Sequence, residues 1–213
     1  MSMVQIERLV RNVAMYAPNC PEPTILYALR MTIIDFCQET MWWTKTLDPI
    51  DVEEGETEYP LNAGSGVEPV SVLAAWYKDI PLYPMGQASH DKWPWLKIDE
   101  RAAKPAAYTT VGFETIKLAP KPDRSEKNAL VVKVAVMPTM EATTVDGELM
   151  SFWTDTLING ALARIYDIPN QPFTNPGAAD KRELMYRRDL VRAKIHANKA
   201  KTNVSLTVKP RHP

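Results

Sequence analysis

The sequence has 213 residues, of which 45% are hydrophobic and 24% charged, and its formal net charge is −1. This length and composition predict a globular protein of one large domain or two small ones. No apolar run approaches the roughly 18 residues of a membrane-spanning helix, and the first residues lack the pattern of a signal peptide. Cys20 and Cys37 have the spacing of neither a metal site nor a disulfide framework.

The charges are distributed unevenly along the chain. Residues 181–213 contain ten basic and two acidic residues, a formal charge of +8, so the other residues carry −9. Such asymmetry is typical of a segment that binds an acidic protein surface, nucleic acid or another copy of the chain. A solvated basic helix without a partner is the alternative.

Two helices are expected at the start of the chain. Apolar residues recur at helical spacing over residues 4–16 and again from Pro23 to Met41, with Trp42 and Trp43 directly after the second run. Prolines between the two runs end the first helix. We expect the pair to pack as an antiparallel hairpin.

Short extended segments follow and predict a small antiparallel sheet. Residues 51–61 have the pattern of a strand, a turn and a second strand, and the Lys78-Asp79 pair has that of a hairpin turn. A short helical turn is expected around Trp93, Trp95 and Leu96. The other predicted strands are 67–77, 80–83, 108–111, 115–118 and 130–136.

Two further helices are expected after Pro138. Asp146 is a suitable N-cap for the first, and Asn175 with Pro176 marks the start of the second, which ends near Ala200. The predicted apolar face of the first helix is Leu149, Phe152, Trp153, Leu157, Gly160, Ala161 and Ile165. The predicted stripe of the second is Ala179, Tyr186, Leu190, Ala193 and Ala197, widened by Leu184, Val191 and Ile195.

The end of the chain, residues 202–213, alternates apolar and polar side chains. This period of two is typical of a strand that adds to a sheet edge, in the same chain or on another subunit; a frayed terminus is the alternative. The chain thus divides into a helix pair (1–45), a β-rich insertion (46–140), a second helix pair (141–200) and an extended arm (201–213).

Residue patterns of enzymes are missing from the sequence. It contains no GxSxG, GxxxxGK[ST] or HExxH motif. Glu53, Glu54, Glu56 and Glu58 form an acidic run, for which a solvated edge strand is a simpler interpretation than acid–base chemistry or metal binding. We expect no enzymatic activity, no cofactor and no metal.

The order of these segments resembles that of the bacteriophage head–tail adaptor (connector) proteins, which dock beneath the portal. The resemblance covers nearly the whole chain and lies in the order of segments that are individually loose. They are Trp42-Trp43, DVEEGETEYPL, VSVLAAWYKDIPLYP, KPAAYTTVGFETIKLAPKPD, LVVKVAVMP, LINGALARIYDIPN and YRRDLVRAKI.

The resemblance implies an α+β, mainly α fold, in which the N- and C-terminal helices form a bundle with a small antiparallel β-sheet inserted and an extended C-terminal tail. It also implies a virion protein, made in the host cytoplasm, that forms a ring of twelve copies at the head–tail interface. The implied partners are the portal protein, a tail or nozzle protein, and genomic DNA that passes through without sequence specificity; no membrane is involved.

The basic C-terminal segment is the candidate docking site within this scheme. We expect Arg187, Arg188, Arg192 and Lys194 to face an acidic surface of the portal or of a neighbouring copy. The apolar residues of the tail are expected to add a strand or fill a groove on the portal; they are Val204, Leu206 and Val208. The alternative is a nucleic-acid-binding module that uses the basic helix to contact phosphates.

Overall fold

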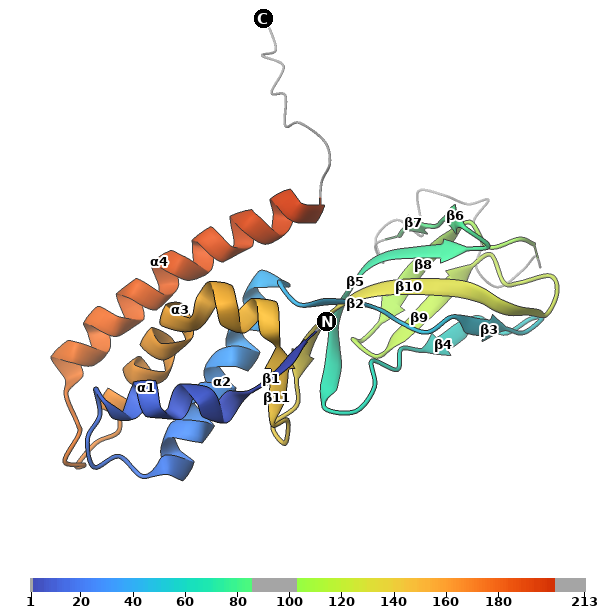
Figure 1. Ribbon diagram of the computed structural model, residues 1–213. Helices are drawn as coiled ribbons and strands as arrows, with labels where there is room; N and C mark the ends of the chain where they lie inside the picture. The colour runs from blue at the N-terminus through green and yellow to red at the C-terminus, as the bar shows by residue number, and fades with distance from the viewer. Residues whose placement is uncertain (1, 86–102, 202–213) are drawn as a thin grey trace, which may run out of the picture.

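The computed structural model describes residues 2–85 and 103–201. The molecule is elongated, with a helical part at one end and a sheet part at the other (Figure 1). Of the described residues, 40% are helical and 29% lie in strands. The helical turn predicted around Trp93, Trp95 and Leu96 lies outside these residues.

The strands of the described residues form three sheets. In chain order they are β1 (Met3–Gln5), β2 (Thr44–Thr46), β3 (Ile50–Val52), β4 (Glu58–Pro60), β5 (Val67–Tyr77), β6 (Ile80–Pro81), β7 (Tyr83–Pro84), β8 (Ala107–Val111), β9 (Thr115–Ala119), β10 (Glu126–Pro138) and β11 (Thr144–Asp146). One sheet has the order β2-β10-β5-β6, with β3 also paired to β10. The second has the order β4-β9-β8-β7, and β1 with β11 forms the third.

The prediction of a mainly α bundle with one small inserted antiparallel sheet is therefore wrong. The 13-residue strand β10 is long enough to pair with β2, β3 and β5. The predicted strand–turn–strand unit at 51–61 is divided between two sheets, because β3 joins β10 while β4 joins β9. One pair, β7 with β8, is parallel. Such pairings join segments distant in sequence and leave no local pattern.

The hairpin between β5 and β6 confirms its prediction. β5 spans Val67–Tyr77, and Lys78 and Asp79 have φ angles of 48° and 62°. Two successive residues in the left-handed region make the turn whose twist matches that of the paired strands. Tyr77 then lies opposite Ile80 in the ladder.

The first segment of the chain differs from its prediction. Instead of one helix over residues 4–16, β1 is followed by a 3-10 helix η1 (Ile6–Leu9) and by α1 (Val10–Ala14). β1 is extended because its backbone pairs with β11, where Val4 lies opposite Val145. The start of the chain is thus tied to the entrance of the next helix.

Local conformations or side-chain caps mark the end of α2 and the starts of the other two long helices. α2 (Glu22–Thr40) ends where Met41 adopts a left-handed conformation, with a φ of 51°. α3 (Gly147–Tyr166) begins at Asp146, whose side chain accepts the backbone N–H of Glu148. α4 (Pro176–Lys201) begins after Asn175, whose side-chain oxygen accepts the backbone N–H of Ala178 at 3.1 Å.

A kink in α3 changes which side chains are buried. Trp153 has non-helical backbone angles, φ −121° and ψ 16°. Phe152, predicted on the apolar face, is 70% exposed instead. The side chain of Trp153 packs against Phe36 and Trp42, with ring centroids 5.7 and 5.3 Å apart.

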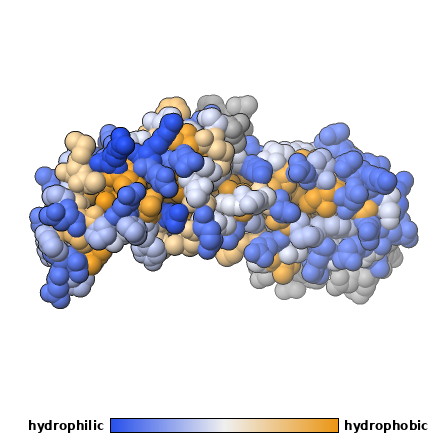
Figure 2. Space-filling model, turned by 60° about the horizontal axis from the view of Figure 1, so that its bottom comes forward, coloured by the Kyte–Doolittle hydropathy of each residue, from blue (hydrophilic) through white to orange (hydrophobic). Residues whose placement is uncertain are grey.

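One hydrophobic core extends from the helical part into the sheets. Its fully buried members include Ile33 and Phe36 of α2, Leu157 of α3, and Ile116 and Val132 of the strands. Figure 2 shows that hydrophobic and hydrophilic residues are interspersed on both parts of the visible face. The shared buried core joins the helical part to the sheet part. The outer side of α4 faces away from this core.

Candidate docking surface

The inner side of α4 packs on α2 and α3. Ala179, Tyr186, Leu190, Ala193 and Ala197 are buried, which confirms the centre of the predicted stripe. The predicted widening of the stripe is wrong, since Leu184, Val191 and Ile195 are 73%, 56% and 50% exposed. Val191 follows Tyr186 by five residues and so lies roughly 140° around the helix from it, on the outer side.

The four basic residues singled out in the sequence lie together on α4, and we call them the docking face. Arg187, Arg188 and Arg192 have exposed side chains, and that of Lys194 is partly exposed. They span two turns of one regular helix. The helix thus presents four cationic groups on one rigid element.

Each member of the docking face has an acidic neighbour in the same chain. Arg187 Nε lies 2.6 Å from Glu183 Oε1, and Arg188 and Arg192 share Asp189 at 3.2 and 3.1 Å. Lys194 pairs with Glu39 of α2. Ion pairs exposed to solvent contribute only about 0–1 kcal/mol, so these cations can exchange their partners for those of another molecule at little cost.

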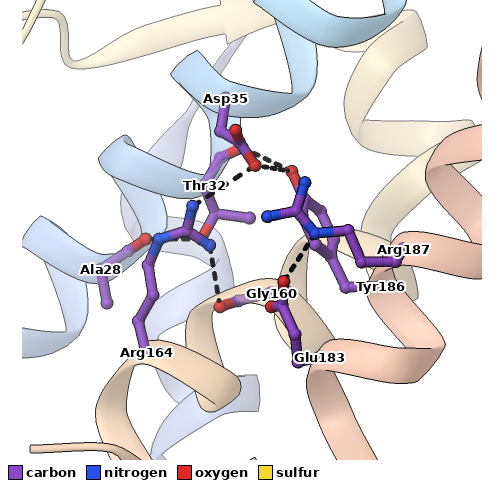
Figure 3. Close-up of polar contacts among 8 residues, drawn as sticks. All are labelled: Ala28, Thr32, Asp35, Gly160, Arg164, Glu183, Tyr186 and Arg187. Carbon is purple, nitrogen blue, oxygen red and sulfur yellow. Dashed lines mark hydrogen bonds and ion pairs between the residues drawn. The ribbon is translucent and has the colours of Figure 1, made fainter. Parts of the chain in front are cut away.

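A polar cluster beneath α4 fixes the helix in place (Figure 3). The Tyr186 hydroxyl donates to Asp35 of α2 at 2.7 Å, and Arg164 of α3 lies 3.4 Å from the same carboxylate oxygen. Arg164 also donates to Thr32 Oγ1 and to the carbonyl oxygen of Gly160, both at 3.2 Å. Three helices therefore meet through one carboxylate.

Packing around this cluster is close. A Cβ atom added at Gly160 would lie 2.5 Å from Thr32 Cγ2 and 2.9 Å from Tyr186 Cδ2. Burial, together with the hydrogen bond to Asp35, raises the pKa of the Tyr186 phenol well above its usual range. The hydroxyl stays protonated and remains a donor to Asp35 at any physiological pH.

A second contact holds the later part of α4. The His196 ring lies 6.3 Å from that of Trp42, between centroids, two residues after the Lys194–Glu39 pair. The first contact joins α4 to Trp42, just beyond the end of α2, and the second joins it to Glu39 of α2. The docking face therefore lies between the buried Tyr186 and the contact of the exposed His196 with Trp42.

Sequence reasoning missed the Asp35–Arg164–Tyr186 cluster. The available signal was weak, because single charged residues within otherwise apolar helices also occur at solvent-facing positions. The three residues lie up to 151 positions apart in the chain. The tail residues Val204, Leu206 and Val208 lie outside the described residues.

Two further observations concern metal binding and membrane insertion. Over residues 2–85 and 103–201, no three His, Cys, Asp or Glu side chains gather closely enough to hold a metal ion. In the same ranges, no helix combines the length and the apolar character needed to cross a membrane. An anchored helix with exposed basic residues is characteristic of a protein that acts through contacts with other macromolecules.

Comparison with known families is consistent with this class. The family model described as SU10 adaptor protein matches residues 4–209, nearly the whole chain. The protein therefore belongs to the SU10 adaptor protein family, a family of phage head–tail adaptors. It is a bacteriophage structural protein and a component of the virion. A search of curated proteins found no match.

Proposed function

We propose that the protein docks as a ring, of twelve copies, beneath the portal and completes the capsid vertex after DNA packaging. The ring then offers an attachment surface to a tail or nozzle protein and forms part of the DNA ejection channel, without sequence-specific contact to DNA. The observation that carries the proposal is the docking face, which is exposed on a helix held in place by its buried inner side and by the Tyr186–Asp35 hydrogen bond. Membership of the adaptor family supports it.

In this mechanism α4 supplies a preformed basic surface for an acidic surface of the portal. A rigid helix loses little conformational entropy when it docks, so more of the interaction energy appears as affinity. We propose further that the arm from residue 201 onward acts as a latch, with Val204, Leu206 and Val208 adding a strand or filling a groove. The units 1–45, 46–140 and 141–200 are the proposed divisions of the scaffold.

Contacts between copies follow from the division of charge. The last 33 residues carry +8 and the rest of the chain −9. Oppositely charged surfaces on one chain favour head-to-tail contacts, which generate a closed ring when the rotation between copies allows it. The acidic run Glu53, Glu54, Glu56 and Glu58 lies on the exposed turn and edge of β3 and β4 and is one such acidic surface.

Portal binding by a truncated chain tests the latch. A chain that ends at Lys201 should fold normally, as seen by circular dichroism, but fail to decorate portal rings in negative-stain microscopy. The full chain should decorate them. Unchanged portal binding by the truncated chain would refute the role of the tail.

Charge reversal tests the docking face. Replacing Arg187, Arg188, Arg192 and Lys194 by Glu should abolish portal binding. The matched control reverses four exposed basic residues elsewhere, Arg8, Arg11, Lys104 and Lys127, and should bind as the wild type does. Equal losses in the two variants would show that net charge, and not this face, governs binding.

Binding measurements with the same variants distinguish the portal from nucleic acid as the partner. Affinity for the portal and for duplex DNA is measured at 50 and 200 mM salt. Binding through phosphate contacts weakens by orders of magnitude over this range. Tight, salt-sensitive DNA binding without portal binding would replace the adaptor mechanism by the nucleic-acid-binding alternative.

A further inference from the structure

The outer side of α4 carries an apolar stripe that nothing in the described chain covers. Leu184, Arg188, Val191 and Ile195 follow one another at spacings of four, three and four residues. This is the spacing of a seam between two helices. The three aliphatic side chains are at least half exposed. The stripe, which we call the outer seam, is about 17 Å long at 1.5 Å per residue.

Basic residues border the outer seam on both sides. In the heptad notation of helix seams, Arg188 and Ile195 occupy a positions, and Leu184 and Val191 occupy d positions. The flanking e and g positions then include Arg187, Arg192, Lys194 and Lys199. Flanking positions of this kind set the choice of partner through their charges. Arg188 can lie along the seam with its aliphatic stem while its guanidinium reaches the rim.

Another copy of α4 does not suit this surface. Two outer seams packed on each other would bring their basic flanks together, and like charges across a helix interface oppose association. The outer side of α2, with Tyr27 at its centre, has Arg30 at its border. It too would bring a cation to the basic flanks of α4.

The acidic turn of a second copy does not suit it either. Glu53, Glu54 and Glu56 could neutralise the flanks, but the apolar residues beside them, Val52 and Tyr59, are buried. Such a turn offers negative charge but no exposed apolar surface for Leu184, Val191 and Ile195. A partner that covers the seam needs both acidic residues and an exposed apolar surface.

We propose that the outer seam binds an amphipathic helix of the portal, with aliphatic residues at alternating spacings of three and four and with Asp or Glu on both flanks. The inference rests on the proposed function and adds the chemistry of the partner at the same surface. The seam accommodates about three turns of that helix. The partner's carboxylates replace Glu183, whose side chain is 41% exposed, and Asp189, whose side chain is 16% exposed, as counter-ions of the arginines.

The test uses the full chain and three fluorescein-labelled synthetic peptides of 21 residues. The first has Leu at every seam position and Glu at every flanking position; the second has Lys at the flanks; the third keeps Glu but has Ser in the seam. Fluorescence anisotropy should show that the first binds at least about tenfold more tightly than the other two. Equal binding of all three, or of the first and third, would overturn the proposal.

Single substitutions locate the binding surface. Val191→Ser should weaken binding of the first peptide about tenfold, because a central apolar contact is lost. Val111→Ser is the matched control, since Val111 of β8 is 47% exposed and Val191 56%. Both residues are exposed, so both variants should keep the wild-type melting temperature. An equal effect of the two substitutions would contradict binding at the outer seam.

Two further measurements separate this inference from the proposed function. If the wild type and the triple variant L184S/V191S/I195S decorate the portal equally well, portal docking stands and the seam inference fails. If neither binds the portal but the first peptide binds selectively, the portal is excluded as the partner and the portal assignment fails. Concentration-dependent association of the wild type, lost in the triple variant, would show by analytical ultracentrifugation that a second copy covers the seam.

Discussion

The hydroxyl group of Tyr186 in α4 donates a hydrogen bond of 2.7 Å to the carboxylate of Asp35 in α2. The same carboxylate oxygen lies 3.4 Å from Arg164 of α3. This carboxylate is the polar junction of the three helices, and the docking face begins one residue after Tyr186. Its loss should loosen α4 while leaving the sheets intact.

Replacing Tyr186 by Phe should lower the free energy of unfolding by about 2 kcal/mol, because a buried hydrogen bond to a charged group is removed. Urea unfolding followed by circular dichroism measures the change. Tyr27→Phe is the control, since Tyr27 is 58% exposed and should change stability by less than about 0.5 kcal/mol. Equal effects would mean that the Tyr186 hydroxyl has no special role.

Gly160→Ala should destabilise the protein by about 1–3 kcal/mol through overpacking. The new methyl group would meet Thr32 and the Tyr186 ring, and this cost exceeds the gain of up to about 1 kcal/mol in helix propensity. Thermal unfolding measures the change. Thr32→Ser in the same chain should restore part of the loss, because it removes Cγ2. Gly177→Ala, with open space around it, should not destabilise.

Acid should weaken the sheet part through Glu126. The Lys78 ammonium at 2.6 Å, helped by the Tyr77 hydroxyl at 3.0 Å, lowers the pKa of the Glu126 carboxyl below its ordinary value. The unfolded chain therefore binds a proton at this carboxyl more readily than the folded chain does. The stabilisation of the fold by Glu126 is present above about pH 4.3 and is lost as the pH falls below that value.

Melting temperatures between pH 6 and pH 3 test this contribution. Glu126→Gln should make the melting temperature depend less steeply on pH below about pH 4.5. Glu141→Gln, at an exposed position, should retain the wild-type slope. A Glu126→Gln slope identical to that of the wild type would contradict the assignment.

Tyr77 should remain protonated in alkaline solution. Burial, and then the hydrogen bond to Glu126, raises the pKa of its phenol to about 12. A group with a raised folded pKa stabilises the fold below its unfolded pKa of about 10 and loses that contribution as the pH rises toward 12. The stability difference between the wild type and Tyr77→Phe should thus shrink from pH 10 to pH 12.

Ultraviolet titration of tyrosinate gives a second reading of the same group. The wild type should retain a phenol that ionises near pH 12, and this step should be missing in Tyr77→Phe. Full ionisation of all eight tyrosines below pH 11 in the folded protein would refute the shift.

The elements that the sequence predicted well are those with local causes. The caps Asp146 and Asn175 and the Lys78-Asp79 turn act within a few residues of their position. Helical periodicity likewise located α2 and the buried centre of the α4 stripe. Such signals need no knowledge of distant segments.

The errors have non-local causes. Pairing with β11 draws residues 3–5 into a strand, and the kink at Trp153 leaves Phe152 exposed. The strands divide into three sheets because β10 and β9 select partners far away in the chain. Strand pairing depends on these tertiary partners more than on intrinsic propensity.

For the docking surface, the sequence by itself determined which residues are basic, that they share one helix, and that the charge is concentrated at one end of the chain. Only the tertiary structure decided which side of α4 is covered. Contacts such as Asp35–Tyr186 and Glu39–Lys194 join positions more than 150 residues apart. These contacts set the orientation of α4. In that orientation Leu184, Val191 and Ile195 point outward beside the arginines. Which side of a helix is buried depends on the segments that the rest of the chain packs against it.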